Sequence, residues 1–228
     1  MKLPNNVNPQ DFQDLNTHIH LQVKQMIWDK KLAPGSKIRQ EHLAQLLGIS
    51  RTPLIKILQR LTSENLVEYV PRRGFYVKRL TLEEMIEIFS VREVVEGVAA
   101  RTVAEHATDQ EILDLKAYFA PFGKDWTPEK IEAYLQADQN FHARMVEIAG
   151  NHLIMQINEM FNIYWFSYQK GLIRHPSETL IEHLRVLDAI EHRAPRAAQE
   201  LAMLHIENSR KNMNRIYAQK NMLNGLSE

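Results

Sequence analysis

The chain has 228 residues, of which 44% are hydrophobic and 25% charged, which is typical of a globular protein. No apolar run approaches the roughly 20 residues that cross a bilayer, and the N-terminus lacks the apolar segment of a secretory signal. The absence of cysteine excludes disulfides and thiolate chemistry, so we expect a cytoplasmic protein with no membrane partner. The net charge of zero hides an asymmetry: residues 1–78 carry 12 Lys and Arg against 6 Asp and Glu, and the remainder carries 16 against 22. This asymmetry suggests that only the first part meets a polyanion.

An amphipathic helix is predicted first, because apolar residues from Leu15 to Ile27 recur at three- and four-residue spacing. It should end near Lys30 or Lys31, before Pro34-Gly35. A short helix follows over "QEHLAQLLG", closed by Gly48. Ser50 then fits the N-cap of a further helix, whose first turn contains Pro53. This order of helix, tight turn and helix predicts a helix-turn-helix.

The helix from about Arg51 to Glu64 divides into two faces. Leu54, Ile57, Leu58 and Leu61 form its buried stripe, and the opposite arc carries groups that can reach a phosphate or a base edge: Arg51, Thr52, Ile55, Lys56 and Gln59. Ile55 fits either apolar contact with a thymine methyl or a place beside the core. The stretch "LVEYVPRRGFYVKRL" then predicts two short strands around Arg72, Arg73 and Gly74. A hairpin tipped by two arginines directly after a recognition helix is typical of a wing that touches DNA.

Residues 12 to 79 resemble the winged-helix domain of GntR-type bacterial transcription regulators. The resemblance rests on Pro34-Gly35, Leu43-Ala44, the run from Gly48 to Pro53, Leu58, Leu61, Leu66-Val67 and Arg73-Gly74. It implies that the protein binds DNA as a dimer, with Arg51 on the operator and the wing near Arg73-Gly74 inserted. We expect a homodimer on a palindromic double-stranded operator, with DNA contacts from Arg39, Ser50, Arg51, Thr52, Ile55, Lys56, Gln59, Arg72, Arg73 and Gly74. Ile55-Lys56 stands where the family usually has Arg-Glu, which puts one expected guanine contact in doubt.

The rest of the chain predicts helices without strands. "TLEE" and "TDQE" fit the capping box, and Pro128, Pro176 and Pro195 fit helix starts. We expect helices over roughly 81–106, 109–120, 128–148, 151–171, 177–192 and 195–219. The chain is therefore predicted to be mainly α, with an N-terminal winged helix-turn-helix of three helices and a β-hairpin (residues 1–79) followed by an all-α bundle (residues 80–228).

Asp138 and His142 lie four residues apart on one predicted helix, where both side chains point the same way and can share a divalent metal. Alone this pair is weak evidence for a metal, and the alternative is that Asp138 orients His142 by a hydrogen bond. His183 and His205 lie on or near apolar faces of two later helices, where buried imidazoles need partners. One Asp and three His from three helices would suit Zn²⁺ or Ni²⁺ better than Ca²⁺.

Three stretches, "VREVVEGVAARTVAEHAT", "DQNFHARMVEIAGN" and "EHLRVLDAIEHRAPRAAQELAMLHI", resemble the effector (FCD) domain of the FadR subgroup of GntR regulators. This resemblance implies that Asp138, His142, His183 and His205 are metal ligands. It also implies a small carboxylate effector near Arg92 and Asn151, consistent with the Lewis acidity of a metal and the fork of an arginine. From the aromatic stretch "MFNIYWFSYQKGL" we expect Tyr168 to line the effector cavity. The other histidines, including His18, His20 and His175, are expected at the surface or at caps.

The resulting hypothesis is a ligand-responsive transcription factor, a repressor rather than an enzyme, in which a metal and a small acid modulate operator binding. One alternative is a constitutive DNA-binding protein whose helical domain only dimerises. The other is a helical metalloenzyme, but no general base accompanies the ligands and no Glu-x-x-His repeat of di-metal bundles is present.

Overall fold

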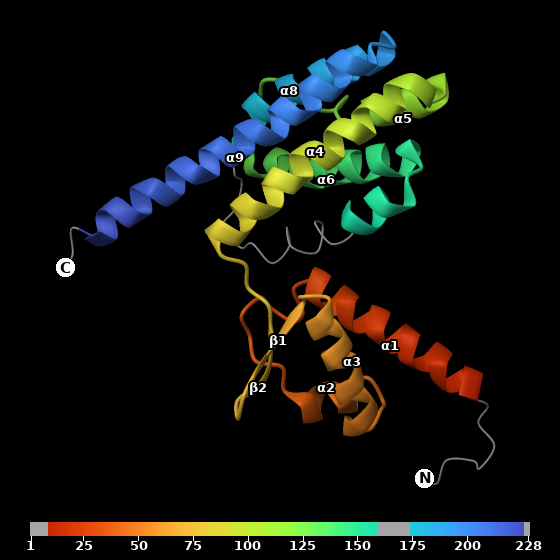
Figure 1. Ribbon diagram of the computed structural model, residues 1–228, viewed down its shortest axis with the longest axis vertical. Coiled ribbons are helices and arrows are strands. Elements are labelled where there is room, and N and C mark those ends of the chain that lie inside the picture. Colours follow the sequence, from red (N-terminus) through yellow and green to blue (C-terminus); the bar gives the residue numbers. More distant parts are fainter. Residues whose placement is uncertain (1–8, 159–173, 226–228) are drawn as a thin grey trace. The chain divides into compact units, whose positions relative to one another are not determined.

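The computed structural model describes residues 9–158 and 174–225, with side chains over 16–158 and 174–222 (Figure 1). The chain divides into two compact units, the first running to Leu80 and the second starting at Thr81. We call them the N-terminal unit and the helical unit.

The N-terminal unit contains the predicted helix-turn-helix. Helix α1 spans Pro9–Trp28, α2 spans Gln40–Leu46 and α3 spans Arg51–Ser63. Between α2 and α3, Gly48 has a φ of 68°, in the left-handed region where a side chain is disfavoured. Ser50 occupies the predicted N-cap position of α3, although its side chain makes no capping hydrogen bond.

Strands β1 (Val67–Val70) and β2 (Gly74–Val77) follow α3 and pair antiparallel, with Val67 opposite Val77 and Val70 opposite Gly74. The predicted hairpin is therefore confirmed. A buried apolar cluster joins the helices to this hairpin, because each element contributes its hydrophobic face. Its members include Ile19, Val23, Ile27, Leu43, Leu54, Leu58, Leu61, Val67 and Phe75.

The helical unit is formed by α4 (Leu82–His106), α5 (Asp109–Ala117), α6 (Pro128–Ala149), α8 (Pro176–Glu191) and α9 (Pro195–Gly225). Both predicted capping boxes are present: the Thr81 hydroxyl accepts from the Glu84 amide and Thr108 does the same for Glu111, while each glutamate returns a bond to the threonine amide. Residues 152–158 are helical, and the rest of the helix expected over 151–171 lies outside the described residues. The predicted mainly α fold, with a winged helix-turn-helix before a helical bundle, is confirmed.

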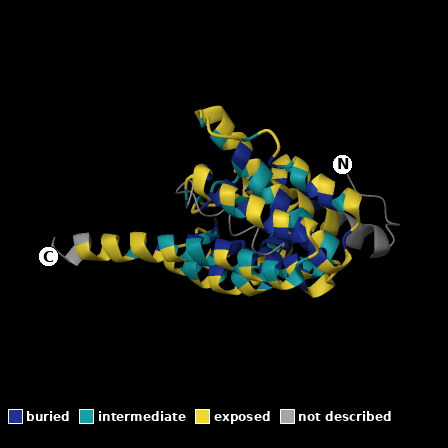
Figure 2. Ribbon diagram, turned by 90° about the horizontal axis from the view of Figure 1, so that it is seen from above, coloured by how far each residue is buried: buried dark blue, intermediate teal, exposed yellow. Residues whose placement is uncertain are grey.

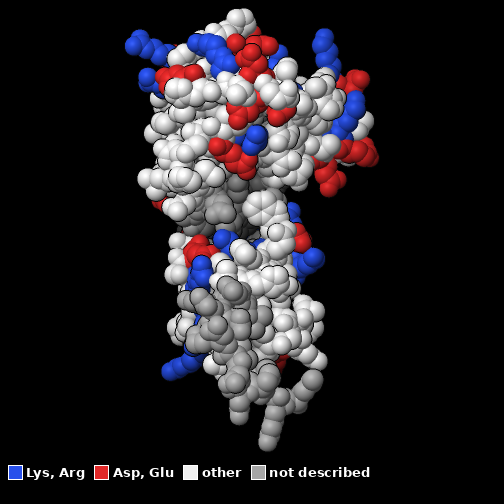
Figure 3. Space-filling model, turned by 90° about the vertical axis from the view of Figure 1, so that its right-hand side faces the viewer, with Lys and Arg blue, Asp and Glu red and all other residues white. Residues whose placement is uncertain are grey.

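The core of the helical unit is apolar and aromatic, with Phe119, Tyr134, Phe141, Met145, Leu187 and Ile190 among its buried members. Buried residues line the inner sides of the helices, and the last turns of α9, near the C-terminus, are largely exposed (Figure 2). Acidic and basic side chains are interspersed on the surface of this unit in Figure 3. No helix that the structure describes is long and apolar enough to cross a membrane.

Candidate DNA-reading surface and metal centre

A groove of about 990 Å³ runs between α2, α3 and the hairpin of the N-terminal unit. The sequence-predicted DNA contacts that line it are Arg39, Arg51, Ile55, Gln59, Arg72, Arg73 and Gly74. Ser50, Thr52 and Lys56 are exposed on the same helix-turn-helix without lining the groove. Ile55 is half-buried and lines the groove.

Arg51 is the first residue of α3, and its side chain extends to the first turn of α2. Its Nε donates to the Gln40 carboxamide oxygen at 3.3 Å, and one terminal nitrogen lies 3.5 Å from a Glu41 carboxylate oxygen. The Arg51 side chain is 59% exposed, so these contacts hold the guanidinium at the surface rather than bury it. A cation held in this way at the front of a recognition helix can reach a base edge or a phosphate.

The tip of the hairpin is shaped by two left-handed residues. Arg72 has a φ of 63° and Gly74 a φ of 97°. Arg72 and Arg73 are exposed between strands β1 and β2, and the Arg73 amide donates to the Val70 carbonyl at 3.0 Å, which closes the turn. The turn therefore presents two cations at the groove, as a wing requires.

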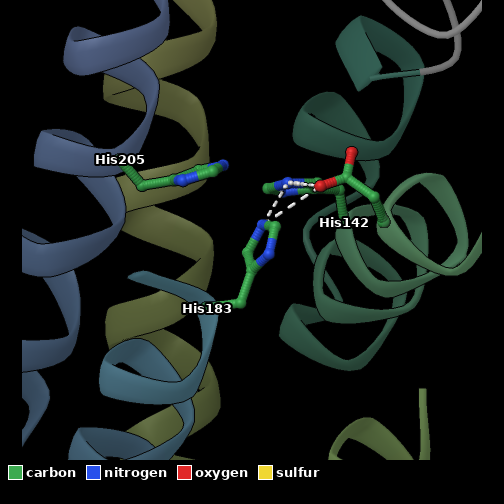
Figure 4. Close-up of side chains that lie close together, drawn as sticks. His142, His183 and His205 are labelled. Carbon is green, nitrogen blue, oxygen red and sulfur yellow. Dashed lines mark hydrogen bonds and ion pairs between the residues drawn. The ribbon is translucent and has the colours of Figure 1, made fainter. Parts of the chain in front are cut away.

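The helical unit brings together the four residues predicted as metal ligands. Asp138 and His142 come from α6, His183 from α8 and His205 from α9, and one donor atom from each lies within 4.8 Å of the others. In Figure 4 the three imidazoles approach one another from three different helices. All three are at least 95% buried: His142 is 3% exposed, His183 0% and His205 5%. The sequence alone could not place these helices side by side.

Each imidazole has an outer partner at Nδ1. The Nδ1 of His142 contacts the Glu96 carboxylate, and the Nδ1 of His205 lies 2.8 Å from the Glu182 carboxylate. The Nδ1 of His183 lies 2.9 Å from the Tyr134 hydroxyl. A carboxylate acceptor places the ring proton on Nδ1 and leaves the Nε2 lone pair directed inward, which is the tautomer that binds a metal.

The two outer glutamates are themselves anchored. Arg92 donates from Nε to Glu96 on the same helix, and Arg174 donates to both oxygens of Glu182 at 2.6 and 2.8 Å. Asn208 adds a bond to Glu182 at 2.8 Å. Arg92 and Arg174 therefore each place a positive charge against one of the two outer glutamates.

The charges and burial shift the acidity of these groups. Burial opposes ionisation of Glu96, but the positive charge of Arg92 and a hydrogen bond from His142 outweigh it and lower the pKa of Glu96 to about 2. Hydrogen bonds from His205 and Arg174 likewise overcome burial and lower the pKa of Glu182 to about 2. Burial lowers the pKa of His183 well below its usual range and also lowers that of His205. Glu96 and Glu182 are therefore ionised at neutral pH, and His183 and His205 are neutral.

The donor separations among Asp138, His142 and His183 fit a divalent transition metal. Four atoms bound to one ion at about 2.0–2.2 Å lie roughly 3–4 Å from one another. The Nε2 atoms of His142 and His183 are 3.2 Å apart, and Asp138 Oδ1 lies 3.3 Å from the Nε2 of His183. With protons on Nδ1, the two Nε2 lone pairs face each other, an arrangement that a cation between them would stabilise. Asp138 Oδ1 is 3.9 Å from the Nε2 of His142, so the alternative in which Asp138 orients His142 by a hydrogen bond is wrong.

Aromatic rings close one side of the cluster. The ring of Phe119 stacks on His183 with centroids 4.6 Å apart and planes at 10°, and Phe141 meets the same imidazole edge-on at 5.2 Å. Both phenylalanines are buried. These contacts fix the orientation of His183 and exclude water from that side.

The residues predicted to bind an effector have separate positions. Arg92 lies with its guanidinium carbon 5.1 Å from the Phe89 ring centre, and its contact with Glu96 joins it to the cluster through His142. Asn151 is exposed, and its side-chain oxygen accepts from the amides of Leu153 and Ile154 at 3.0 and 3.2 Å, which caps the helix that follows. Tyr168 lies outside the described residues.

Sequence reasoning missed the outer partners Glu96, Tyr134 and Glu182. Glu96 offered a recognisable pattern, because it lies seven residues from both Phe89 and Val103 on the buried face of α4. Of the remaining histidines, His175 is the N-cap of α8, in agreement with the prediction that it is a surface or cap residue. His20 is only 3% exposed and lies 2.8 Å from Glu64, so the prediction that it is a surface or cap residue is wrong.

Comparison with known proteins agrees with both units. Residues 15–77 match the gntR family of bacterial regulatory proteins, and residues 87–208 match the FCD domain. The HTH-type transcriptional regulator YdhC of Bacillus subtilis is 25% identical over 190 residues, covering 81% of this chain and 84% of YdhC. The Nta operon transcriptional regulator of Aminobacter aminovorans is 27% identical over 179 residues, covering 76% of this chain and 82% of that protein.

Two solved structures share the fold. A putative GntR transcriptional regulator from Rhodococcus sp. RHA1 superposes with a TM-score of 0.69 at 18% identity, covering 87% of this chain and 96% of the other. McbR/YncC of E. coli superposes with a TM-score of 0.66 at 17% identity, covering 89% and 98%. With a helix-turn-helix, an arginine-tipped wing and a helical unit matched to the FCD domain, the chain belongs to the GntR family of DNA-binding transcription regulators and is not an enzyme.

Proposed function

We propose that this regulator senses a small organic acid through a divalent metal, Zn²⁺ or Ni²⁺, bound by Asp138, His142, His183 and His205. The observation that carries the proposal is the convergence of three buried imidazoles, each with Nδ1 engaged by an outer partner. Imidazole nitrogen with one carboxylate oxygen is a donor set suited to these borderline metals. When bound, the metal supplies Lewis acidity and a positive charge toward which a carboxylate can be drawn.

Arg92 is the second element of the proposed effector site. Its Nε is engaged by Glu96, so the terminal nitrogens of the guanidinium form the part that would meet a carboxylate. Asn151 and Tyr168 stay proposed effector contacts, with the capping bonds of Asn151 accounting for its side chain in the absence of ligand.

We further propose that a homodimer places two copies of the Arg51 helix and the Arg72-Arg73 wing on a palindromic operator and acts as a repressor. Ser50, Thr52 and Lys56 supplement the groove residues on the DNA. The acid must bind the DNA-competent arrangement and its alternative with different affinities, or no regulation results. A coupling of about 1–3 kcal/mol would change operator affinity roughly 5- to 150-fold.

The test combines metal analysis with operator binding by the full-length protein. Elemental analysis after purification without chelator should find Zn²⁺ or Ni²⁺ in the parent, and His183→Ala should lose it. His106→Ala is a matched control, because His106 is 75% exposed at the end of α4.

Fluorescence anisotropy with operator DNA is then measured against a panel of small mono- and dicarboxylic acids, with and without EDTA. We expect at least one acid to change the operator Kd in a metal-dependent manner. Equal metal content in His183→Ala and the parent, or operator affinity that no acid and no chelator alters, would favour the alternative of a helical domain that only dimerises.

A further inference from the structure

An apolar stripe lies on the outer face of α4. Val91, Val94 and Val98 are spaced by three and four residues and are 50%, 55% and 38% exposed. The opposite face of the helix, which includes Phe89 and Val103, is buried in the helical unit. Exposed apolar residues on an ordinary protein surface are scattered singly, whereas these three valines form one continuous row. The stripe is therefore a candidate contact surface.

Charged residues continue the stripe at both ends. Glu87 lies seven residues before Val94 and Arg101 seven residues after it, so at 100° per residue both fall on the valine row. Both residues are exposed. Arg101 donates to Glu105 one turn further on at 3.0 Å. Glu87 and Arg101 therefore lie at equal distances from Val94 on opposite sides of the valines, and Glu105 lies one turn beyond Arg101.

We propose that a second copy of this chain covers the stripe, with the two α4 helices antiparallel about a two-fold axis at Val94. This pairing places Glu87 opposite the partner's Arg101 and Arg101 opposite the partner's Glu87, while the valines pack between them. A parallel pairing would place like charges opposite each other. A patch that is complementary to itself under a two-fold rotation is the signature of an isologous dimer contact. The inference rests on the homodimer proposed above and adds the surface that forms it.

The spacing of the stripe supports helix-on-helix packing. Positions 87, 91, 94, 98, 101 and 105 alternate steps of four and three residues, the heptad seam by which two helices pack along their length. Charged residues at the ends of such a seam set partner orientation. The apolar centre then supplies the attraction, and Glu87 and Arg101 select the antiparallel arrangement.

The first test changes the centre of the stripe in the full-length protein. Val94→Glu would place two carboxylates at the two-fold axis, and we expect the dimer Kd from sedimentation velocity to rise by at least about 100-fold. Leu113→Glu is the matched control, because Leu113 is 56% exposed on α5 and lies outside the stripe. It should leave the dimer unchanged. Circular dichroism verifies that both variants fold.

The second test uses charge reversal. Glu87→Arg and Arg101→Glu each create two like-charge contacts per dimer, so each should raise the dimer Kd by about tenfold at low salt. The double variant Glu87→Arg/Arg101→Glu restores opposite charges and should return the Kd to near that of the parent. If neither single reversal changes the Kd, or if the double variant is no better than the singles, the antiparallel arrangement is wrong.

The third test detects the contact directly and does not depend on weakening the dimer. The chain contains no cysteine, so Val94→Cys introduces one thiol per subunit. A disulfide forms between residues whose Cα atoms approach within about 7 Å, which two copies of one residue reach only near a two-fold axis. We expect mild oxidation to give a covalent dimer with Val94→Cys and not with Leu113→Cys. Cross-linking at position 113 but not at 94 overturns the proposal.

The outcomes separate this surface from the proposed function. A dimer that persists in Val94→Glu, with metal content and operator binding intact, would refute the interface and leave the sensor proposal standing. A monomeric Val94→Glu that retains metal while operator binding weakens would support both. A parent that dimerises through the stripe but binds neither metal nor acid would support the interface and refute the sensor.

Discussion

The Tyr134 hydroxyl lies 2.9 Å from the Nδ1 of His183, inside a cluster where both residues are buried. The same hydroxyl lies 2.8 Å from the Thr179 hydroxyl, which is 3.5 Å from the Pro176 carbonyl. A ligating Nε2 requires the His183 proton on Nδ1, so His183 donates to Tyr134, Tyr134 to Thr179 and Thr179 to the backbone. Burial, with the nearby Asp138 charge, raises the pKa of Tyr134, so the phenol keeps the proton that this chain of donors needs.

Tyr134→Phe should therefore weaken metal binding while preserving the aromatic core. We expect the metal Kd, measured by competition with a chelator, to rise about tenfold, the lower end for loss of an outer partner. Tyr118→Phe is the control, since Tyr118 packs against the same core from the end of α5. Equal affinity in parent and Tyr134→Phe would mean that the hydroxyl does not set the His183 tautomer.

Glu96 should be required for folding as well as for metal binding. Its carboxylate is 1% exposed and is shared by Arg92 and His142. Glu96→Ala leaves the Arg92 charge unpaired, and we expect a loss of about 3–5 kcal/mol in the free energy of unfolding. Glu96→Gln keeps the shape and one acceptor, so about 1–3 kcal/mol is expected. Urea unfolding without metal checks both values, and indistinguishable losses for Ala and Gln would contradict the ion-pair explanation.

Arg51 and Arg73 should affect operator binding in different ways. Arg51→Ala removes a group positioned for a base edge, so we expect a loss of about 1–3 kcal/mol in operator affinity and reduced sequence discrimination. Arg73→Ala removes the phosphate contact that we propose for the wing, which should weaken binding to all sequences and lower the salt slope by about 1. Anisotropy titrations at several salt concentrations separate the two. Lys211→Ala, in the helical unit and 61% exposed, should change neither.

His20 should make the N-terminal unit sensitive to acid. Burial lowers the pKa of His20, and attraction to Glu64 only partly opposes this. Above the ordinary histidine pKa near 6.5 the residue is neutral in both folded and unfolded chains, so it adds no pH dependence there. As the pH falls below 6.5, the unfolded chain takes up a proton more readily, and the folded state loses stability.

Thermal unfolding between pH 7.5 and 5.5 checks this sign in metal-free protein. His20→Gln should show a smaller decrease in Tm than the parent over that interval, whereas His18→Gln, at an exposed position on the same helix, should behave like the parent. A parent that gains stability on acidification would show that the contact with Glu64 outweighs burial.

The helices and the turn were predictable from local chemistry. The histidine cluster was predictable only in part. The helix starts after Thr81 and Thr108 were predictable because a capping box depends only on residues close in the sequence. The turn at Gly48 was predictable because glycine readily adopts a positive φ, as it does here. The pair Asp138 and His142 indicated a ligand set because both sit on one helix. Tyr134 and Glu182 were missed because their roles depend on how α6, α8 and α9 pack, and no local spacing encodes that.

The outer contacts of the cluster have a mechanical consequence. Glu96 joins α4 to His142 on α6, Tyr134 joins α6 to His183 on α8, and Glu182 joins α8 to His205 on α9. A metal bound by the three histidines would close these pairwise links into a single brace across four helices. In a chain without cysteine, such an ion would cross-link the helices as a disulfide does in secreted domains. Unlike a disulfide, this cross-link could be removed by a fall in the metal concentration, without any redox chemistry.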